Sequence, residues 1–176
     1  MSAPATRLPA KVQTPVHIRW MIRRDMPEVL TIESQAFEFP WSEDDFVRCL
    51  RQRNCIGMVA EHNERVVGMM IYELHKNRLH ILNFAVHEQM RRRGIGGQMI
   101  RKLISKLSPQ RRSRIMLEIR ETNLAAQLFF RDVGFRAISL LRDFYEDTTE
   151  DAYLIQYRYV PSVVAMDEER PRRMAG

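Results

Sequence analysis

The sequence contains few cysteines and no long apolar run, and these two absences exclude several classes of protein. Its 176 residues include two cysteines, Cys49 and Cys55, which lie close together and outside any metal-ligand pattern. Free thiols of a cytoplasmic protein are therefore favoured over a disulfide. No apolar stretch approaches the roughly 20 residues that a bilayer-spanning helix needs, and residues 1–11 have no signal-peptide core. We expect a cytoplasmic protein without a membrane partner.

The histidines are also few, and their spacing predicts no metal site. The five histidines are His17, His62, His75, His80 and His87, and none follows a metal-ligand pattern. His80 lies in a predicted strand, where we expect a cross-strand surface residue rather than a catalytic one.

Positive charge is abundant by contrast, and much of it is concentrated in clusters of arginine. The net charge is +6, and the clusters lie at residues 91–93, 111–114 and 170–173. Such clusters suggest an anionic partner, either nucleic acid or a phosphorylated small molecule. A solvated surface is the alternative explanation for the second and third clusters. The first opens a glycine-rich turn, which favours the small molecule, so we do not expect nucleic acid as a partner.

One domain is predicted between two tails. Residues 1–16 and 161–176 lack hydrophobic periodicity and are expected to be flexible, whereas residues 17–160 form a single domain. Apolar and β-branched segments in this domain predict strands, and apolar residues at helical spacing predict helices. The predicted strands are 17–22, 56–61, 65–74, 79–86, 113–119, 135–142 and 152–160, and the predicted helices are 25–37, 42–50, 94–107 and 123–133.

The order of these elements predicts a mixed α/β fold. Short turns at 63–64 and 76–77 join three consecutive strands, which indicates an antiparallel meander over residues 56–86. The complete order, β-α-α-β-β-β-α-β-α-β-β, differs from a regular βαβ alternation. Asp25 is the expected N-cap of the first helix, and Glu33 is the only polar residue on that helix's apolar face.

The most informative segment is a basic, glycine-rich turn between an apolar strand and an amphipathic helix. Residues 82–97 read LNFAVHEQMRRRGIGG. Free backbone N–H groups at a helix start favour an anion, and glycine lets the main chain approach it closely. The spacing matches neither the Rossmann fingerprint nor a P-loop. We expect a bound diphosphate, and the alternative is a tight turn with solvated arginines.

Around this turn the sequence resembles the GNAT acetyltransferases. The segment RRRGIG at 91–96 is similar to the family's Gln/Arg-x-x-Gly-x-Gly/Ala signature. FPWSE at 39–43, LEIR at 117–120, the pair Asn123 and Ala126, and VGF at 133–135 have the order and spacing of the RimI-type ribosomal-protein alanine N-acetyltransferases. The resemblance covers residues 18–159, which is nearly the whole predicted domain.

This resemblance implies the GNAT fold, acetyl-CoA as co-substrate and no metal. The implied fold has a mixed central sheet of six to seven strands with an antiparallel N-terminal meander, splayed at the cofactor site and flanked by four helices. Pantetheine is then expected between strands 79–86 and 113–119, and the diphosphate at the glycine-rich turn. The implied cofactor-binding residues are Phe84, Ala85, Val86, Arg91, Arg92, Arg93, Gly94, Ile95, Gly96, Gly97, Asn123 and Phe130, of which Asn123 is also a candidate helix cap.

The resemblance places Glu118 at the position of the family's general base. A carboxylate in a partly buried strand beside a cleft is suited to take a proton from an amine. Pairing with Arg120 or with another arginine is the alternative role for Glu118. A backbone N–H between Phe84 and Val86 is expected to stabilise the oxyanion. Because neither cysteine lies at a catalytic position of the family, we expect direct acetyl transfer to the amine.

One position departs from the family pattern. The family's tyrosine, which protonates the leaving thiolate, corresponds here to Phe130. Phenylalanine has no proton to donate, so Tyr145 is the predicted substitute as a catalytic residue. Contact with the substrate and simple packing are the alternative roles for Tyr145, and contact is the more favoured of these.

The acceptor is predicted only by class. By resemblance, Phe39, Trp41, Ser42, Glu43 and Tyr145 frame a peptide entrance, although Trp41 is equally suited to anchor the core. The implied acceptor is a protein N-terminal α-amine, with a ribosomal protein as one candidate. The second hypothesis is a small-molecule amine or a lysine as acceptor. The third is a non-catalytic module that binds coenzyme A or docks on the ribosome.

Overall fold

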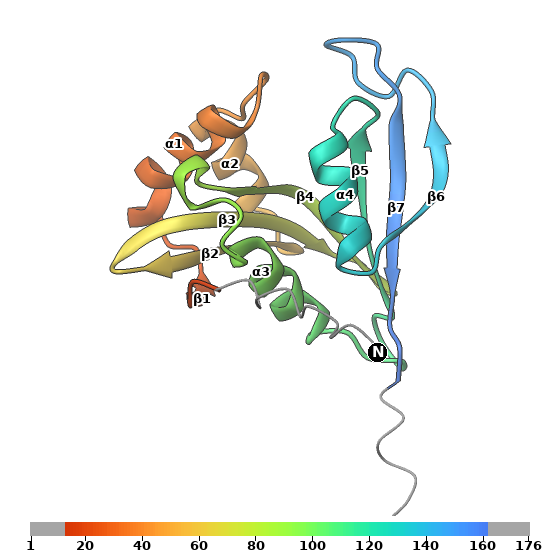
Figure 1. Ribbon diagram of the computed structural model, residues 1–176, viewed down its shortest axis with the longest axis horizontal. Helices are drawn as coiled ribbons and strands as arrows, with labels where there is room; N and C mark the ends of the chain where they lie inside the picture. The colour runs from red at the N-terminus through yellow and green to blue at the C-terminus, as the bar shows by residue number, and fades with distance from the viewer. Residues whose placement is uncertain (1–12, 162–176) are drawn as a thin grey trace, which may run out of the picture.

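The fold is seen in a computed structural model that describes residues 13–161 (Figure 1). The remaining parts of the two predicted tails, 1–12 and 162–176, lie outside the described residues. Seven strands form one sheet in the order β1-β2-β3-β4-β5-β7-β6, which confirms the predicted mixed sheet. The strands are β1 (His17–Trp20), β2 (Cys55–His62), β3 (Arg65–Leu74), β4 (Arg78–Val86), β5 (Arg114–Arg120), β6 (Arg136–Leu141) and β7 (Ala152–Arg158).

Helices cover both faces of this sheet. The α-helices of the described residues are α1 (Met26–Ala36), α2 (Glu43–Leu50), α3 (Ile95–Ile104) and α4 (Leu124–Asp132), and short 3-10 turns lie at η1 (Arg23–Asp25) and η2 (Glu88–Met90). Apolar residues of α1 and α2 pack in one core cluster, and those of α3 and α4 pack in a second cluster. Figure 1 shows α1 and α2 on one side of β2–β4 and α3 on the other.

The central strand β3 shows why the sheet needs cover on both faces. Its residues from Val66 to Tyr72 are all buried. Met69 and Ile71 belong to the cluster beneath α1 and α2, whereas Met70 and Tyr72 belong to the cluster beneath α3. Alternate side chains of a strand point to opposite faces, so a continuous apolar run requires a helix layer on each side.

The sheet opens between β4 and β5, and this opening positions the site. The two strands pair in parallel only from Arg78–Arg114 to His80–Met116. Beyond that point β4 continues to Val86 beside β3, while β5 continues to Arg120 beside β7. The two halves of the sheet therefore diverge, as Figure 1 shows, and the splay implied by the sequence is confirmed.

Two local expectations were met only in part. Asp25 is the N-cap residue of α1, as expected, but its side chain makes no cap bond to the helix. Its carboxylate instead accepts the N–H of Ile22 at 2.9 Å and pairs with Arg19 at 2.7 Å. These bonds stabilise the η1 turn between β1 and α1, which the sequence pattern did not predict. Phe135 was expected in a strand, but it precedes β6 and is buried in the core.

The two cysteines lie where α2 meets β2. Cys49 and Cys55 are buried free thiols with their Sγ atoms 2.7 Å apart, and burial raises the pKa of each thiol. This arrangement agrees with the expectation of free thiols. No helix in the described part of the chain is long and apolar enough to cross a membrane.

Candidate active site

A cavity of about 370 Å³ lies where β4 and β5 diverge. Its walls come from segments that are far apart in the sequence: the end of α1, the α1–α2 loop, β4, β5, the start of α4 and the β6–β7 loop. The structure thus brings together residues that the sequence could relate only by resemblance. The predicted site residues that line the cavity are Phe39, Trp41, Phe84, Glu118, Asn123, Phe130 and Tyr145.

The glycine-rich turn at the start of α3 presents free backbone donors. Arg92 and Gly94 both have left-handed backbone, with φ of 64° and 76°. Within the described residues, no hydrogen bond uses the backbone N–H groups of Ile95, Gly96 or Gly97. Successive free N–H groups at a helix start form a concave anion-binding surface, and the helix dipole adds to it. The turn therefore has the donors that a diphosphate needs.

Glycine at position 96 is also required by close packing. A Cβ atom there would lie 3.2 Å from the ring of Phe129 on α4 and 3.3 Å from the ring of Phe84 on β4. These two rings pack on each other with centroids 5.8 Å apart. Because α4 approaches α3 this closely, a side chain at Gly96 would push the wall of the cofactor region outward.

The three arginines of the turn are exposed, and one of them makes a hydrogen bond within the protein. The Nε of Arg91 donates to the carbonyl of Val86 at 3.1 Å, which folds this side chain back onto the end of β4. Arg92 and Arg93 have exposed side chains at the same turn. Arg91 therefore supports the turn from its β4 side, and the other two add positive charge around it.

Residues at the start of the described part of the chain form hydrogen bonds with the first turn of α3. The N–H of Thr14 donates to the carbonyl of Arg93 at 2.9 Å, and the side-chain amide of Gln98 bonds both Thr14 and Val16. Residues 13–16, which were expected to belong to a tail, thus lie along the first turn of α3. They help to hold the glycine-rich turn in place.

Glu118 projects from β5 into the cavity, where its partner is a histidine. Its Oε2 lies 2.7 Å from the Nε2 of His80 on β4. The alternative pairing with Arg120 is not made, because Arg120 instead bonds Asp147 at 2.7 Å. His80 was expected to be a plain surface residue. Its contact with Glu118 was missed because the two residues meet only through the parallel β4–β5 register.

Tyr145 reaches the cavity from the β6–β7 loop. The guanidinium of Arg120 lies 3.8 Å from its ring centroid, in a cation–π contact that holds the ring over β5. Burial raises the pKa of the Tyr145 hydroxyl to about 12, although Arg120 acts in the opposite direction. This phenol therefore holds its proton more tightly than an ordinary tyrosine does.

Phe130 lies in an aromatic cluster on α4. Its ring packs edge to face against Phe84, Phe129 and Phe135, with centroids 5.9, 5.0 and 5.0 Å away. The residue is buried and still lines the cavity. Asn123, at the start of the same helix, accepts the N–H of Ala126 at 3.1 Å, so its predicted cap role is confirmed while it also borders the cavity.

Only some of the residues predicted to frame the peptide entrance lie at the cavity. Phe39 and Trp41 line the cavity, and Trp41 also packs against Phe46, with ring centroids 5.3 Å apart. Ser42 caps α2 together with Asp45. Glu43, the first residue of α2, is exposed and does not line the cavity. The segment therefore contributes through its two aromatic residues.

Two polar residues of the cavity wall were missed by sequence reasoning. Glu33 of α1 is buried, and its carboxylate accepts the N–H of Trp41 at 2.8 Å and the amide N–H of Asn83 at 2.9 Å. Burial raises the pKa of the Glu33 carboxyl, and these two donors oppose the effect. The Oδ1 of Asn83 is buried without a partner in the described residues. The signal was present, because Glu33 stood alone on an apolar helix face.

Comparisons with known proteins agree with this geometry. The sequence pattern of the "Acetyltransferase (GNAT) family" matches residues 23–135. The [ribosomal protein bS18]-alanine N-acetyltransferase of Escherichia coli strain K12 is 28% identical over 133 residues, which cover 74% of this chain and 89% of that protein.

Two solved structures have a similar fold. A crystal structure of the Escherichia coli ribosomal-protein alanine N-acetyltransferase has a TM-score of 0.74 at 24% identity, covering 87% of this chain and 99% of that one. NAA60 of Arabidopsis thaliana in complex with acetyl-CoA has a TM-score of 0.72 at 18% identity, covering 82% and 99%.

Proposed function

We propose that this chain, which belongs to the acetyltransferase (GNAT) family, transfers acetyl from acetyl-CoA directly to the N-terminal α-amine of a protein. The observation that carries the proposal is the position of Glu118, in a cavity between splayed strands that also borders the unpaired edge of β4. The bacterial and plant relatives support the same class of reaction.

The residues present fit coenzyme A. The free N–H groups at the start of α3 would bind its diphosphate, with Arg92 and Arg93 adding charge at the same turn. The main chain of β4 beyond His80 has no strand on its β5 side, so Phe84, Ala85 and Val86 can pair with pantetheine as with another strand. Asn123 and Phe130 border this path from α4.

Direct transfer requires a neutral amine, a base and a donor for the developing oxyanion. We propose that Glu118 accepts the proton from the attacking amine, either directly or through a water molecule. A backbone N–H between Phe84 and Val86 would donate to the carbonyl oxygen as it gains charge. The amine nitrogen then bonds to the acetyl carbon, and the coenzyme leaves as a thiolate.

The acceptor class follows from the ease of deprotonation. An α-amino group has a pKa of about 7.7–8.0, whereas a lysine side chain has a pKa of about 10.4. One carboxylate is therefore sufficient help for an α-amine near neutral pH. The cavity wall also holds Glu33, Glu118 and Asp147 against a single cation, Arg120, which favours an incoming ammonium group.

Tyr145 has two candidate roles, and we propose that contact with the acceptor is the main one. Because burial raises the pKa of this hydroxyl to about 12, it is a weak acid toward a thiolate whose own pKa is about 8.5. Its ring, fixed by Arg120, is instead placed to pack against the first residues of a peptide. Phe39 and Trp41 would form the opposite side of that entrance.

We further propose a ribosomal protein as acceptor and the cytoplasm as location. The Escherichia coli relative acts, by its name, on an alanine of a ribosomal protein. Peptides that begin with alanine and copy ribosomal-protein N-termini are therefore the first acceptors to test. Two buried free thiols fit the reducing conditions of the cytoplasm.

The test is a panel of acceptors, incubated with acetyl-CoA while the free thiol of coenzyme A is measured. We expect thiol release with peptides that have a free α-amine and none with the same peptides after N-terminal blocking. Release with blocked lysine peptides or with polyamines would replace the proposed acceptor by a side-chain or small-molecule amine. Binding of coenzyme A without release from any acceptor would make the chain a binding module.

The Phe130→Tyr variant tests whether a general acid at position 130 would speed the departure of the thiolate. We expect kcat to rise by several-fold, and by about 10²-fold at most, which is the low end for general acid catalysis, because a thiolate is already a tolerable leaving group. The measurement is kcat with the best peptide of the panel. Phe144→Tyr adds the same hydroxyl to an exposed ring that does not line the cavity, so it is the control and should leave kcat unchanged. An unchanged or lower kcat for Phe130→Tyr would show that this position does not lack a useful acid.

A further inference from the structure

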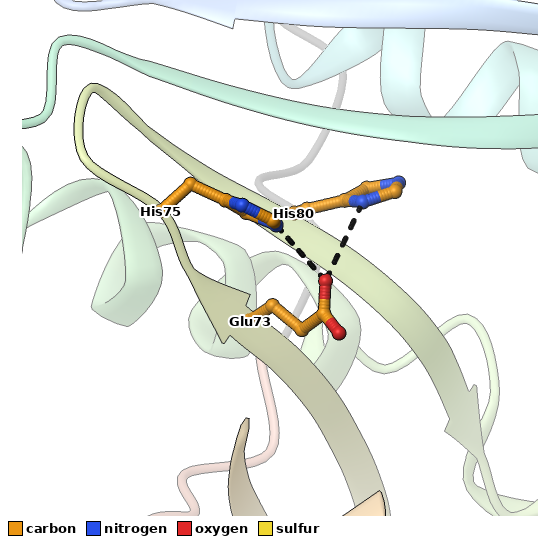
Figure 2. A group of neighbouring side chains, drawn as sticks. All are labelled: Glu73, His75 and His80. Carbon is orange, nitrogen blue, oxygen red and sulfur yellow. Dashed lines mark hydrogen bonds and ion pairs between the residues drawn. The ribbon is translucent and has the colours of Figure 1, made fainter. Parts of the chain in front are cut away.

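Three potential metal ligands meet at the β3–β4 hairpin, outside the cavity described above. Glu73, His75 and His80 place one ligand atom each within 4.8 Å of one another. The Oε2 of Glu73 lies 2.9 Å from the Nε2 of His75 and 4.0 Å from the Nδ1 of His80. Figure 2 shows both rings directed toward the same carboxylate oxygen.

The hairpin explains why these residues meet although their spacing resembles no metal motif. Glu73 and His80 are direct partners in the antiparallel β3–β4 pair. His75 follows Glu73 by two residues, and its N–H donates to the carbonyl of Arg78 at 3.0 Å across the turn. Two ligands therefore come from opposite strands and the third from the turn, so that the backbone ladder holds all of them.

Two imidazole nitrogens and one carboxylate oxygen form a ligand set suited to Zn²⁺ and related divalent transition metals. Zinc binds such atoms at about 2.0–2.2 Å in tetrahedral geometry, which separates neighbouring ligand atoms by roughly 3.4 Å. The Oε2 of Glu73 lies 2.9 Å from the Nε2 of His75 and 4.0 Å from the Nδ1 of His80, so the two distances lie on either side of that value. Side-chain rotations that bring both distances close to it would form the zinc site. The three side chains are between 20% and 31% exposed, which leaves access for an ion and for water as a fourth ligand.

Charges of both signs surround the cluster. Glu73 contributes one negative charge, and Glu118 contributes another next to His80. Lys76 and Arg78 belong to the same hairpin, and Arg112 donates its Nε to the backbone carbonyl of His75 at 2.7 Å. Of these charges, the two carboxylates are the ones in direct contact with the histidine rings. We propose that Glu73, His75 and His80 bind one Zn²⁺ or similar divalent transition-metal ion.

An ion at this site would act on the acetyl-transfer site through His80. The Nδ1 of His80 faces Glu73, and its Nε2 lies 2.7 Å from Glu118. A carboxylate can only accept in this contact, so the ring hydrogen of His80 is already on Nε2. A metal on Nδ1 would fix this tautomer and make the Nε2–H a stronger donor to Glu118, as in the carboxylate–histidine–metal arrays of known sites. The stronger bond would make Glu118 a weaker base toward the acceptor amine. This consequence rests on the proposed role of Glu118, whereas metal binding itself does not.

Binding is tested on the full-length, tag-free protein after treatment with a chelator, by titration calorimetry with Zn²⁺ alone and by the visible absorption of Co²⁺. We expect one ion per chain with a micromolar dissociation constant. His75→Ala should weaken binding by roughly 10-fold or more, because it removes one of three ligands. His17→Ala, on the edge strand β1, is the matched control and should bind as the unchanged protein does. No binding, or equal binding by His75→Ala, would overturn the proposal.

The effect on catalysis needs a separate measurement. With the best peptide acceptor, Zn²⁺ at a concentration that saturates the unchanged protein but leaves His75→Ala largely metal-free should lower kcat of the unchanged protein several-fold and leave kcat of His75→Ala unchanged. Binding at the site with an unaltered kcat would remove the proposed link to Glu118. Because calorimetry does not depend on acetyl transfer, failure of the metal site is distinguishable from failure of the proposed function.

Discussion

Replacing Glu118 by glutamine is expected to lower kcat by about 10²–10³-fold, because the variant has no carboxylate to accept the amine proton. Glutamine has nearly the same size and can still hydrogen-bond the ring of His80, so the packing of β5 should be kept. The dissociation constant for acetyl-CoA should remain within a factor of about two, since the coenzyme would bind through the α3 turn and the β4 main chain. Steady-state kinetics with the best peptide and calorimetry with the coenzyme measure the two quantities.

Glu121→Gln is the matched control for this change. Glu121 directly follows β5, is exposed and does not line the cavity. Its substitution removes the same charge just beyond the end of the same strand and should leave kcat within a factor of about two. If Glu118→Gln retained kcat to within about threefold, Glu118 would not be the base, and its bond to His80 would be the main reason for its position.

Replacing Gly94 by valine is expected to weaken coenzyme A binding by about 10²-fold or more. Gly94 has a φ of 76°, and a Cβ there would lie 2.9 Å from the side chain of Gln13. A β-branched residue is strained in this region, so the turn would shift and move the N–H groups that follow it. Loss of two charge-assisted hydrogen bonds, each worth about 1.5–3 kcal/mol, corresponds to a change of this size.

The control for Gly94→Val must carry similar strain at another place. Gly134 has a φ of 102°, and a Cβ there would lie 3.1 Å from the ring of Tyr157, beyond the end of α4. Gly134→Val should lower the melting temperature and leave the coenzyme dissociation constant nearly unchanged. Calorimetry with coenzyme A, at a temperature where both variants are folded by circular dichroism, measures the difference. Normal affinity in folded Gly94→Val would contradict the proposed diphosphate site.

Several features of the protein could be read from its sequence because they depend on local patterns. Alternation and helical spacing predicted the order of strands and helices, and the turn from Arg91 to Gly97 predicted free donors at the start of α3. The resemblance to a known family then added Glu118 and Phe130, which both line the cavity. Boundaries were less accurate, as Phe135 illustrates: it was expected in a strand but precedes β6, and its burial depends on packing against other elements.

The family, the element order and the glycine-rich turn were determined by the sequence alone, since each is a pattern of neighbouring residues. Only the tertiary structure decided the partners of the polar groups: His80 with Glu118, and Glu33 with Asn83. These pairs depend on strand register and on how one helix lies across the sheet. Register and packing arise from the whole fold, so contacts between residues distant in sequence leave no local pattern from which they could be predicted.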